Sequence, residues 1–206
     1  MLRIVLNVAR LVVAALAIVA ISYQFATLRS EVPTFSPANF FSFFTIQTNL
    51  LAIAMLGLVV IVRPAERTAR FDAVRGAVTL YITITGVVFA VLLAGQQESL
   101  DTHIAWVDFT VHKLIPVVLV ADWLIDPPRH RLPFAIGLAW LLYPLAYLVY
   151  TLIRGAEVDW YPYPFLDVAK HGYGGVLLNC AVMLVGFVAA AAAFVAVGNR
   201  RAARGS

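Results

Sequence analysis

Charged side chains are scarce in this chain of 206 residues. Only 13% of the residues are Asp, Glu, Lys or Arg, whereas 62% are hydrophobic. Soluble domains average roughly a quarter charged and about half apolar residues. A core built by a chain of this length cannot enclose so much apolar surface. The composition therefore argues against a soluble enzyme and predicts a protein whose surface is solvated by lipid.

Cysteine and the common catalytic motifs are also scarce. Cys180 is the single cysteine, which excludes an intrachain disulfide and any multi-cysteine zinc or iron–sulfur site. The sequence has no HExxH, GxSxG or GxxxxGK[ST] motif, so we expect neither a metal nor another cofactor. The formal net charge is +4, but the basic residues sit in short clusters between apolar runs. That pattern is typical of membrane topology rather than of nucleic-acid binding.

Six stretches are long and apolar enough to cross a bilayer, which takes about 20 helical residues. They cover residues 8–28, 40–62, 76–95, 104–125, 134–153 and 174–197. Each apolar run is continuous rather than alternating, which predicts helices. The expected fold is a single all-α domain over residues 1–206, an integral membrane bundle of six transmembrane helices.

The distribution of basic residues predicts the orientation of these helices. Of the 15 Lys and Arg, those in the segments on one side are Arg3, Arg10, Arg63, Arg67, Arg70, Arg75, Arg129, Arg131, Arg200, Arg201 and Arg204. The other side carries the acidic residues Glu31, Glu98, Asp101, Glu157, Asp159 and Asp167, with an aromatic belt of Trp160, Tyr161 and Tyr163. By the positive-inside rule, both termini are predicted to be cytoplasmic, in a multi-pass protein of the inner cell membrane.

Polar residues in the second stretch are candidates for function, because polar groups at bilayer depth need a compensating reason. Thr45, Thr48 and Asn49 follow the aromatic run FFSFF at spacings of three and four, so they share one face of the helix. Their ordinary role would be to join neighbouring helices by hydrogen bonds or to bond their own helix's carbonyls.

The fourth stretch is the most unusual, because Asp108, His112 and Asp122 fall on one of its faces. Asp108 can accept from one imidazole nitrogen of His112 and leave the other free as a base. Asp122, with Asp126, is expected to face water near the cytoplasmic end. Three roles are open for Lys113: snorkelling to the interface, pairing with Asp108, or attracting an anionic head group.

Depth connects the two stretches. At 1.5 Å per helical residue, Thr45 and His112 lie about 8 Å and 12 Å below the outer edges of their apolar runs. A modest tilt removes the difference, so hydroxyl and imidazole can form a nucleophile and base pair suited to acyl transfer. On the fifth stretch, Tyr143, Tyr147 and Tyr150 share a face and either pack or line a cavity.

These residues resemble a known family, the six-span membrane proteins related to the androgen-induced and androgen-dependent tissue-factor-regulating proteins, with their bacterial relatives. The resemblance covers nearly the whole chain and rests on FFTIQTNLL, VHKLIPVVLVADWLIDPP and WYPYPFLD. Animal members hydrolyse fatty acid esters of hydroxy fatty acids with an intramembrane Thr and a His. The resemblance implies Thr45 as nucleophile and His112 as base. Because TIQTN departs from the animal pattern, Thr48 remains a rival nucleophile.

The leading hypothesis is a hydrolase of membrane lipid esters in which Asp108 orients His112. The supporting residues expected to bind substrate or its developing charge are Asn49, Thr48, Tyr147, Lys113 and Arg154. Two alternatives remain. One is a small transporter or channel with a polar path along the fourth stretch. The other is a lipid-binding protein without catalysis. The sequence leaves the oligomeric state open.

Overall fold

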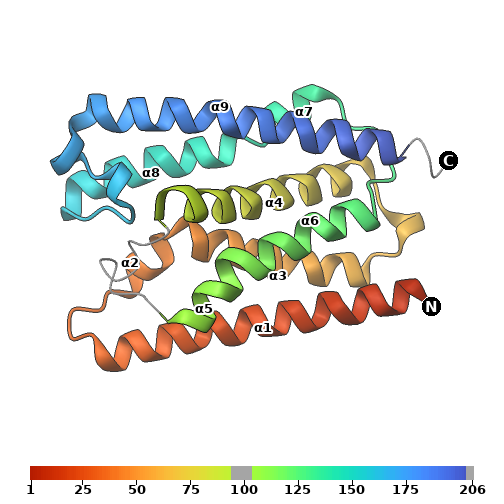
Figure 1. The fold of residues 1–206 in the computed structure, drawn as a ribbon, viewed down its shortest axis with the longest axis horizontal. Coiled ribbons are helices and arrows are strands. Elements are labelled where there is room, and N and C mark those ends of the chain that lie inside the picture. Colours follow the sequence, from red (N-terminus) through yellow and green to blue (C-terminus); the bar gives the residue numbers. More distant parts are fainter. Residues whose placement is uncertain (94–103, 203–206) are drawn as a thin grey trace.

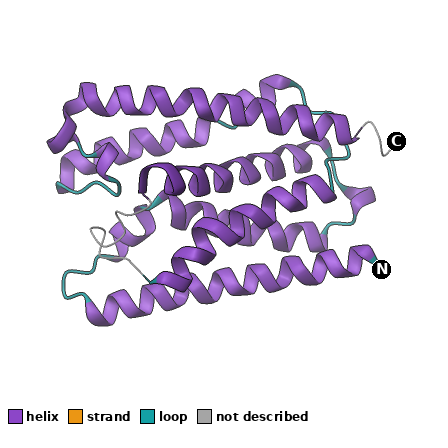
Figure 2. Cartoon of the chain, in the orientation of Figure 1, coloured by secondary structure: helices purple, strands orange, loops and turns teal. Residues whose placement is uncertain are grey.

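The computed structural model describes residues 1–93 and 104–202. Within these two ranges the helices are joined by loops and there is no strand (Figure 2), which confirms the predicted all-α class. The helices run lengthwise in one bundle (Figure 1). The last two residues of the predicted 76–95 stretch lie outside the described residues, as do Glu98, Asp101 and Arg204.

Among the described residues, five helices are long and apolar enough to cross a membrane. They are α1 (Leu2–Glu31), α3 (Phe44–Ile61), α4 (Ala69–Val88) with the π-helical turn η2 (Phe89–Leu93), α7 (Phe134–Ala139) with α8 (Leu142–Val158), and α9 (Val168–Ala202). In the most apolar window of α9 only 11% of the residues are buried, and in that of α1 only 28%. A surface this apolar suits lipid rather than water.

The predicted stretch 104–125 is helical but not uniform. It consists of α5 (Ala105–Phe109), a π-helical turn η4 (Thr110–Leu114) and α6 (Ile115–Ile125). Pro116 has no N–H, so the His112 carbonyl loses its usual partner in the next turn. Gly86 of α4 allows a close approach here, because a Cβ at that position would lie 3.1 Å from the His112 carbonyl oxygen.

The predicted continuous helix over 40–62 is wrong, because the helix breaks at Phe43. The short helix α2 (Pro37–Ser42) begins with Pro37 in its first turn, and the Ser36 hydroxyl caps it by accepting from the Asn39 N–H (3.3 Å). Phe43 is then extended, with φ −69° and ψ 129°. The chain therefore starts a new helix, α3, within the apolar stretch.

Helices α3, α4 and α6 form the middle of the bundle. α1 packs on α3, α3 on α4 and α4 on α6, while α9 packs on α7 and α4. Leu80, Ile82 and Ile115 have no exposed surface. The N-terminus and the end of α9 lie at the same end of the bundle, and the start of α3 lies toward the opposite end (Figure 1).

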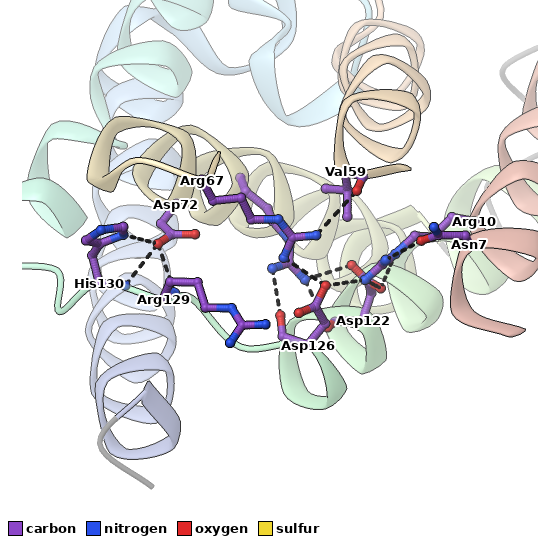
Figure 3. Close-up of polar contacts among 10 residues, drawn as sticks. Asn7, Arg10, Val59, Arg67, Asp72, Asp122, Asp126, Arg129 and His130 are labelled. Atoms are coloured by element: carbon purple, nitrogen blue, oxygen red, sulfur yellow. Dashed lines mark hydrogen bonds and ion pairs between the residues drawn. The ribbon is translucent and has the colours of Figure 1, made fainter. Parts of the chain in front are cut away.

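A buried network of ion pairs joins helices at the end that carries the termini (Figure 3). Arg10 of α1 contacts Asp122 at 2.6 Å and Asp126 at 2.7 Å. Arg75 of α4 contacts Asp122 at 2.8 Å, and Arg67 contacts Asp126 at 2.8 Å. The expectation that Asp122 faces water is therefore wrong. The three arginines are therefore structural partners of the Asp122 and Asp126 carboxylates.

The ionised state of Asp126 follows from its surroundings. Burial alone would raise the pKa of Asp126, but the hydrogen bond from Arg67, the nearby Arg75 guanidinium and the hydrogen bond from Arg10 together lower that pKa below its ordinary value.

Another buried carboxylate, that of Asp72 on α4, accepts from the Arg129 and His130 N–H groups at 2.9 and 3.0 Å. It fixes the loop after α6 to α4.

We expect Arg10→Met to destabilise the protein strongly, because it leaves Asp122 and Asp126 short of a buried partner. Removing one member of a buried ion pair costs about 3 to 5 kcal/mol. Arg3→Met on the same helix is the matched control, since Arg3 is exposed. Denaturant titrations of both variants in detergent micelles measure the free energies of unfolding. Equal values for the two variants would contradict a stabilising role for the network.

Candidate functional site

Thr45 and His112, which are 67 residues apart in the sequence, meet inside the bundle. The Thr45 Oγ1 lies 3.3 Å from His112 Nε2. Thr45 is buried in the first turn of α3, and His112 lies in η4 with its side chain 12% exposed. A hydroxyl within hydrogen-bond reach of an imidazole is the arrangement that activates an oxygen nucleophile.

The break at Phe43 brings Thr45 to the start of a helix, and side chains replace the backbone hydrogen bonds that the break removes. The Ser42 carbonyl accepts from the Tyr147 hydroxyl at 2.9 Å, where a continuous helix would offer a backbone N–H. Unpaired backbone groups are costly in apolar surroundings. Tyr147, on α8, is therefore part of what permits the break.

Two other backbone groups freed by the break are satisfied in the same way. The Phe41 carbonyl accepts from the side-chain amide of Gln47 at 3.0 Å. The Thr45 N–H donates to the Tyr163 hydroxyl at 3.2 Å. Gln47 is in turn held by the Tyr143 hydroxyl, which donates to Oε1 at 2.8 Å. The first turn of α3 is thus held by tyrosines from α8 and from the segment that precedes α9.

Two π-helical turns orient His112. The Phe89 ring, at the start of η2, stacks on the imidazole with centroids 3.9 Å apart and planes 9° apart. The Asp108 Oδ1 lies 3.7 Å from His112 Nδ1, which is longer than a hydrogen bond but close enough to stabilise an imidazolium. With the proton on Nδ1, the lone pair of Nε2 is directed at the Thr45 hydroxyl. The structure thus brings together all three predicted catalytic residues.

Asn49 and Thr48 hold Thr45 in position beside His112 through hydrogen bonds to its carbonyl. The Asn49 side-chain amide donates to the Thr45 carbonyl at 2.8 Å and to the Val111 carbonyl at 3.3 Å. It therefore ties the first turn of α3 to η4. The Thr48 hydroxyl donates to the Thr45 carbonyl at 3.2 Å and lies 2.8 Å from the Thr85 hydroxyl. The hydroxyl beside His112 is that of Thr45 rather than that of its rival, Thr48.

The remaining predicted binding residues are not all at the site. The Lys113 side chain is exposed and lines none of the cavities around Thr45. Arg154 donates to Asn39 Oδ1 at 2.7 Å and its guanidinium lies over the Trp160 ring, 5.3 Å from the centroid. Arg154 therefore joins α8 to α2. Of these residues, Tyr147 alone lines a cavity together with Thr45.

Three cavities meet at Tyr163. The first is apolar, has a volume of about 280 Å³ and is bounded by α3, α4, α8 and α9. The second, of about 50 Å³, contains His112 and Asp108. Thr45 lines both. The third, of about 360 Å³, lies between α2 and the segment that follows α8, where Trp160 and Lys170 line it. Thr45 therefore stands between an apolar chamber and its candidate base.

Tyr163 is the residue that sequence reasoning missed, because it was assigned to an aromatic belt at the interface. Its hydroxyl lies 3.4 Å from Thr45 Oγ1, and burial raises the pKa of Tyr163 so that the hydroxyl keeps its proton. Its ring stacks on that of Phe165 with centroids 5.3 Å apart. The motif YPYP, with a proline on each side of Tyr163, was the available signal for a rigid segment.

The polar path that a transporter would need is interrupted in the described residues. Ile115 and Leu119 lie between His112 and Asp122 on the same helix, are 0% and 3% exposed, and belong to an apolar core. Asp122 itself is paired with Arg10 and Arg75. Asp108 and His112 are therefore separated from Asp122 by apolar side chains.

No protein-family model, curated protein or solved structure matches this chain in the comparisons made. The resemblance to the androgen-induced family stays an expectation from the motifs. Any functional assignment therefore has to rest on the geometry around Thr45 and His112.

We expect Gly86→Ala to destabilise the protein by about 1 to 3 kcal/mol, as overpacking does. The new Cβ would lie 3.0 Å from Pro116 Cβ and 3.1 Å from the His112 carbonyl oxygen, and neither atom belongs to a flexible group. Gly57→Ala on α3 is the matched control, because nothing lies within 4 Å of its Cβ. That control should gain about 0.5 to 1 kcal/mol. Equal gains in unfolding free energy would argue against close packing of α4 on η4.

Proposed function

We propose that this chain is an intramembrane hydrolase of fatty-acyl esters, with Thr45 as nucleophile and His112 as general base. The observation that carries the proposal is the 3.3 Å contact between Thr45 Oγ1 and His112 Nε2 beside an apolar cavity. The motif resemblance to the androgen-induced family of lipid-ester hydrolases points to the same two residues.

The reaction proceeds in two acyl-transfer steps. His112 Nε2 takes the Thr45 proton as Oγ1 attacks the ester carbonyl carbon, and the imidazolium then protonates the departing alcohol. Water, deprotonated by the same nitrogen, attacks the acyl-threonine, and the proton returns to Oγ1 as the fatty acid leaves. Asp108 is a positioning residue, because its carboxylate lies 3.7 Å from Nδ1 and stabilises the imidazolium.

The apolar cavity suits the acyl chain of the substrate. Its volume of about 280 Å³ corresponds to about nine groups the size of a water molecule at about 30 Å³ each. Methylene groups are of similar size, so the cavity accommodates a medium-length acyl chain. Its walls include Leu148, Leu184 and Phe187. For a substrate that enters from water, burial of each methylene stabilises the complex by about 0.8 kcal/mol.

The proposed membrane arrangement has six spans. Residues 105–125, through α5, η4 and α6, supply the sixth span, because their length is close to the roughly 20 residues that a bilayer requires. An even number of spans agrees with termini at one end of the bundle (Figure 1). The basic residues gathered at that end favour a cytoplasmic location in the inner cell membrane. Thr45 and His112 then lie at the level of the outer leaflet.

We expect purified Thr45→Ala to lose ester hydrolysis and His112→Ala to lose about 10²- to 10⁴-fold in kcat, the usual contribution of a general base. Thr45→Ser should retain turnover, since it keeps the hydroxyl. Thr83→Ala on α4 is the matched control, because its hydroxyl donates to the Thr79 carbonyl at 2.7 Å and lines neither cavity that contains Thr45. The measurement is release of fatty acid from a medium-chain ester in detergent micelles.

The same variants, with measurements of lipid binding and of flux, separate the alternatives. Full activity in both Thr45→Ala and His112→Ala would overturn the proposal. Bound lipid without turnover in the wild type would favour a lipid-binding protein. Solute or proton flux in liposomes that depends on His112 but not on Thr45 would favour a channel.

Cys180 offers a test of the acyl site that does not depend on turnover. As the chain's single cysteine and a wall residue of the apolar cavity, it should be shielded from an apolar maleimide by decanoate but not by acetate. At a ligand concentration of 100 Kd, about one site in a hundred is empty, so alkylation should slow about 100-fold. The control is Val185→Cys in a Cys180→Ala background, since Val185 is 72% exposed. Equal protection of both cysteines would contradict a specific acyl site.

A further inference from the structure

The Tyr163 hydroxyl occupies a distinctive position at the start of α3. Its oxygen accepts from the Thr45 N–H at 3.2 Å and lies 3.4 Å from Thr45 Oγ1. A tyrosine hydroxyl has one proton to donate and two lone pairs. The backbone N–H occupies one lone pair, while the proton has two acceptors nearby, Thr45 Oγ1 at 3.4 Å and the Tyr147 hydroxyl oxygen. The hydroxyl is therefore held in place with a proton that can be redirected to a closer acceptor.

Three other polar side chains near Thr45 already donate their protons elsewhere. Both amide protons of Asn49 go to backbone carbonyls. Thr48 donates to the Thr45 carbonyl at 3.2 Å. The Tyr147 hydroxyl, which interacts with that of Tyr163, gives its own proton to the Ser42 carbonyl at 2.9 Å. None of these three can donate to a substrate without breaking a bond that supports the helix break.

We propose that the Tyr163 hydroxyl is the oxyanion donor of the Thr45 reaction. As Thr45 Oγ1 bonds to the ester carbonyl carbon and its proton passes to His112 Nε2, the carbonyl electron pair moves onto oxygen. That oxygen is joined to Oγ1 through a single carbon atom. A donor beside Oγ1 is therefore close to the developing charge, and it shortens its hydrogen bond as the charge grows. The bond relaxes when the carbonyl re-forms and the alcohol leaves with the proton from His112.

The surroundings of Tyr163 preorganise this donor. Prolines precede and follow it in the sequence, and its ring stacks on Phe165 with planes 3° apart and meets the edge of Phe43 at 5.6 Å. The side chain lines all three cavities that meet at the site. A fixed donor of this kind stabilises the transition state without reorganisation during the reaction.

The test compares an ester with its thionoester, in which sulfur replaces the carbonyl oxygen and accepts hydrogen bonds poorly. The inference rests on the proposed hydrolase function, so both substrates are first assayed with wild-type protein. Tyr163→Phe, which keeps the ring packing, should lower kcat for the ester about 10²- to 10³-fold, as loss of one oxyanion donor does. It should lower thionoester turnover much less, so that the ratio of the two rates falls at least about tenfold.

A merely structural role gives a different result. If the hydroxyl serves only to hold the Thr45 N–H, Tyr163→Phe slows both substrates equally and the ratio is unchanged, which overturns the inference. Tyr161→Phe, two residues away in the same segment, is the matched control and should leave both rates and their ratio unchanged. A change in the ratio with Tyr161→Phe as large as that with Tyr163→Phe would also overturn the inference.

Two further outcomes keep the test decisive. If Tyr163→Phe does not fold, the wild-type rate ratio takes its place. A ratio equal to that for hydroxide attack in solution overturns the inference, and a larger ratio supports a donor on the carbonyl oxygen. If the wild type hydrolyses no ester, the proposed function itself fails. An active wild type with an unaltered Tyr163→Phe variant removes only the role of Tyr163.

Discussion

The need to pair every backbone N–H and C=O in apolar surroundings constrains this molecule more than any other interaction. A helix satisfies these groups internally, so any departure from a helix needs side-chain partners at the same depth. The chain departs at Phe43, where Tyr147 and Tyr163 replace the missing bonds, and at η4, where Pro116 has no N–H to offer. Thr45 and His112 lie at these two departures. The candidate site therefore exists because the helices around it are irregular.

The opposite end of the bundle has the complementary task of fixing helix positions. Asp122 lies ten residues after His112, about 15 Å along the helix axis, and is clamped by Arg10 and Arg75. These ion pairs anchor α6 to α1 and α4, and they therefore oppose sliding of His112 along α3. Asn49 does the same locally by joining α3 to η4. The ion pairs of Asp122 and the hydrogen bonds of Asn49 thus both fix the position of η4 along α3.

Sequence reasoning reached the helical class, the positions of most long helices, and the pairing of Thr45 with His112. These depend on hydropathy and on helical rise, which are local properties. It missed the break at Phe43, because FFSFF has the continuous apolarity of a helix and its stabilising tyrosine lies on α8, more than 100 residues later. It missed Tyr163 and the partners of Arg10 for a similar reason. Which side chains meet depends on which helices are neighbours, and the hydrophobic periodicity of a single sequence does not show which helices are neighbours.

The meeting of three cavities at one tyrosine bears on where the products of a cleaved ester would go. The apolar chamber is bounded by α8 and α9, whose outer faces are themselves apolar, while the chamber beyond Tyr163 is lined by Trp160 and Lys170. If the chain cleaves an ester at this junction as proposed, the acyl fragment is left in the apolar chamber and the alcohol fragment faces the chamber lined by Trp160 and Lys170. The two fragments then lie in chambers of different polarity, which opposes their recombination.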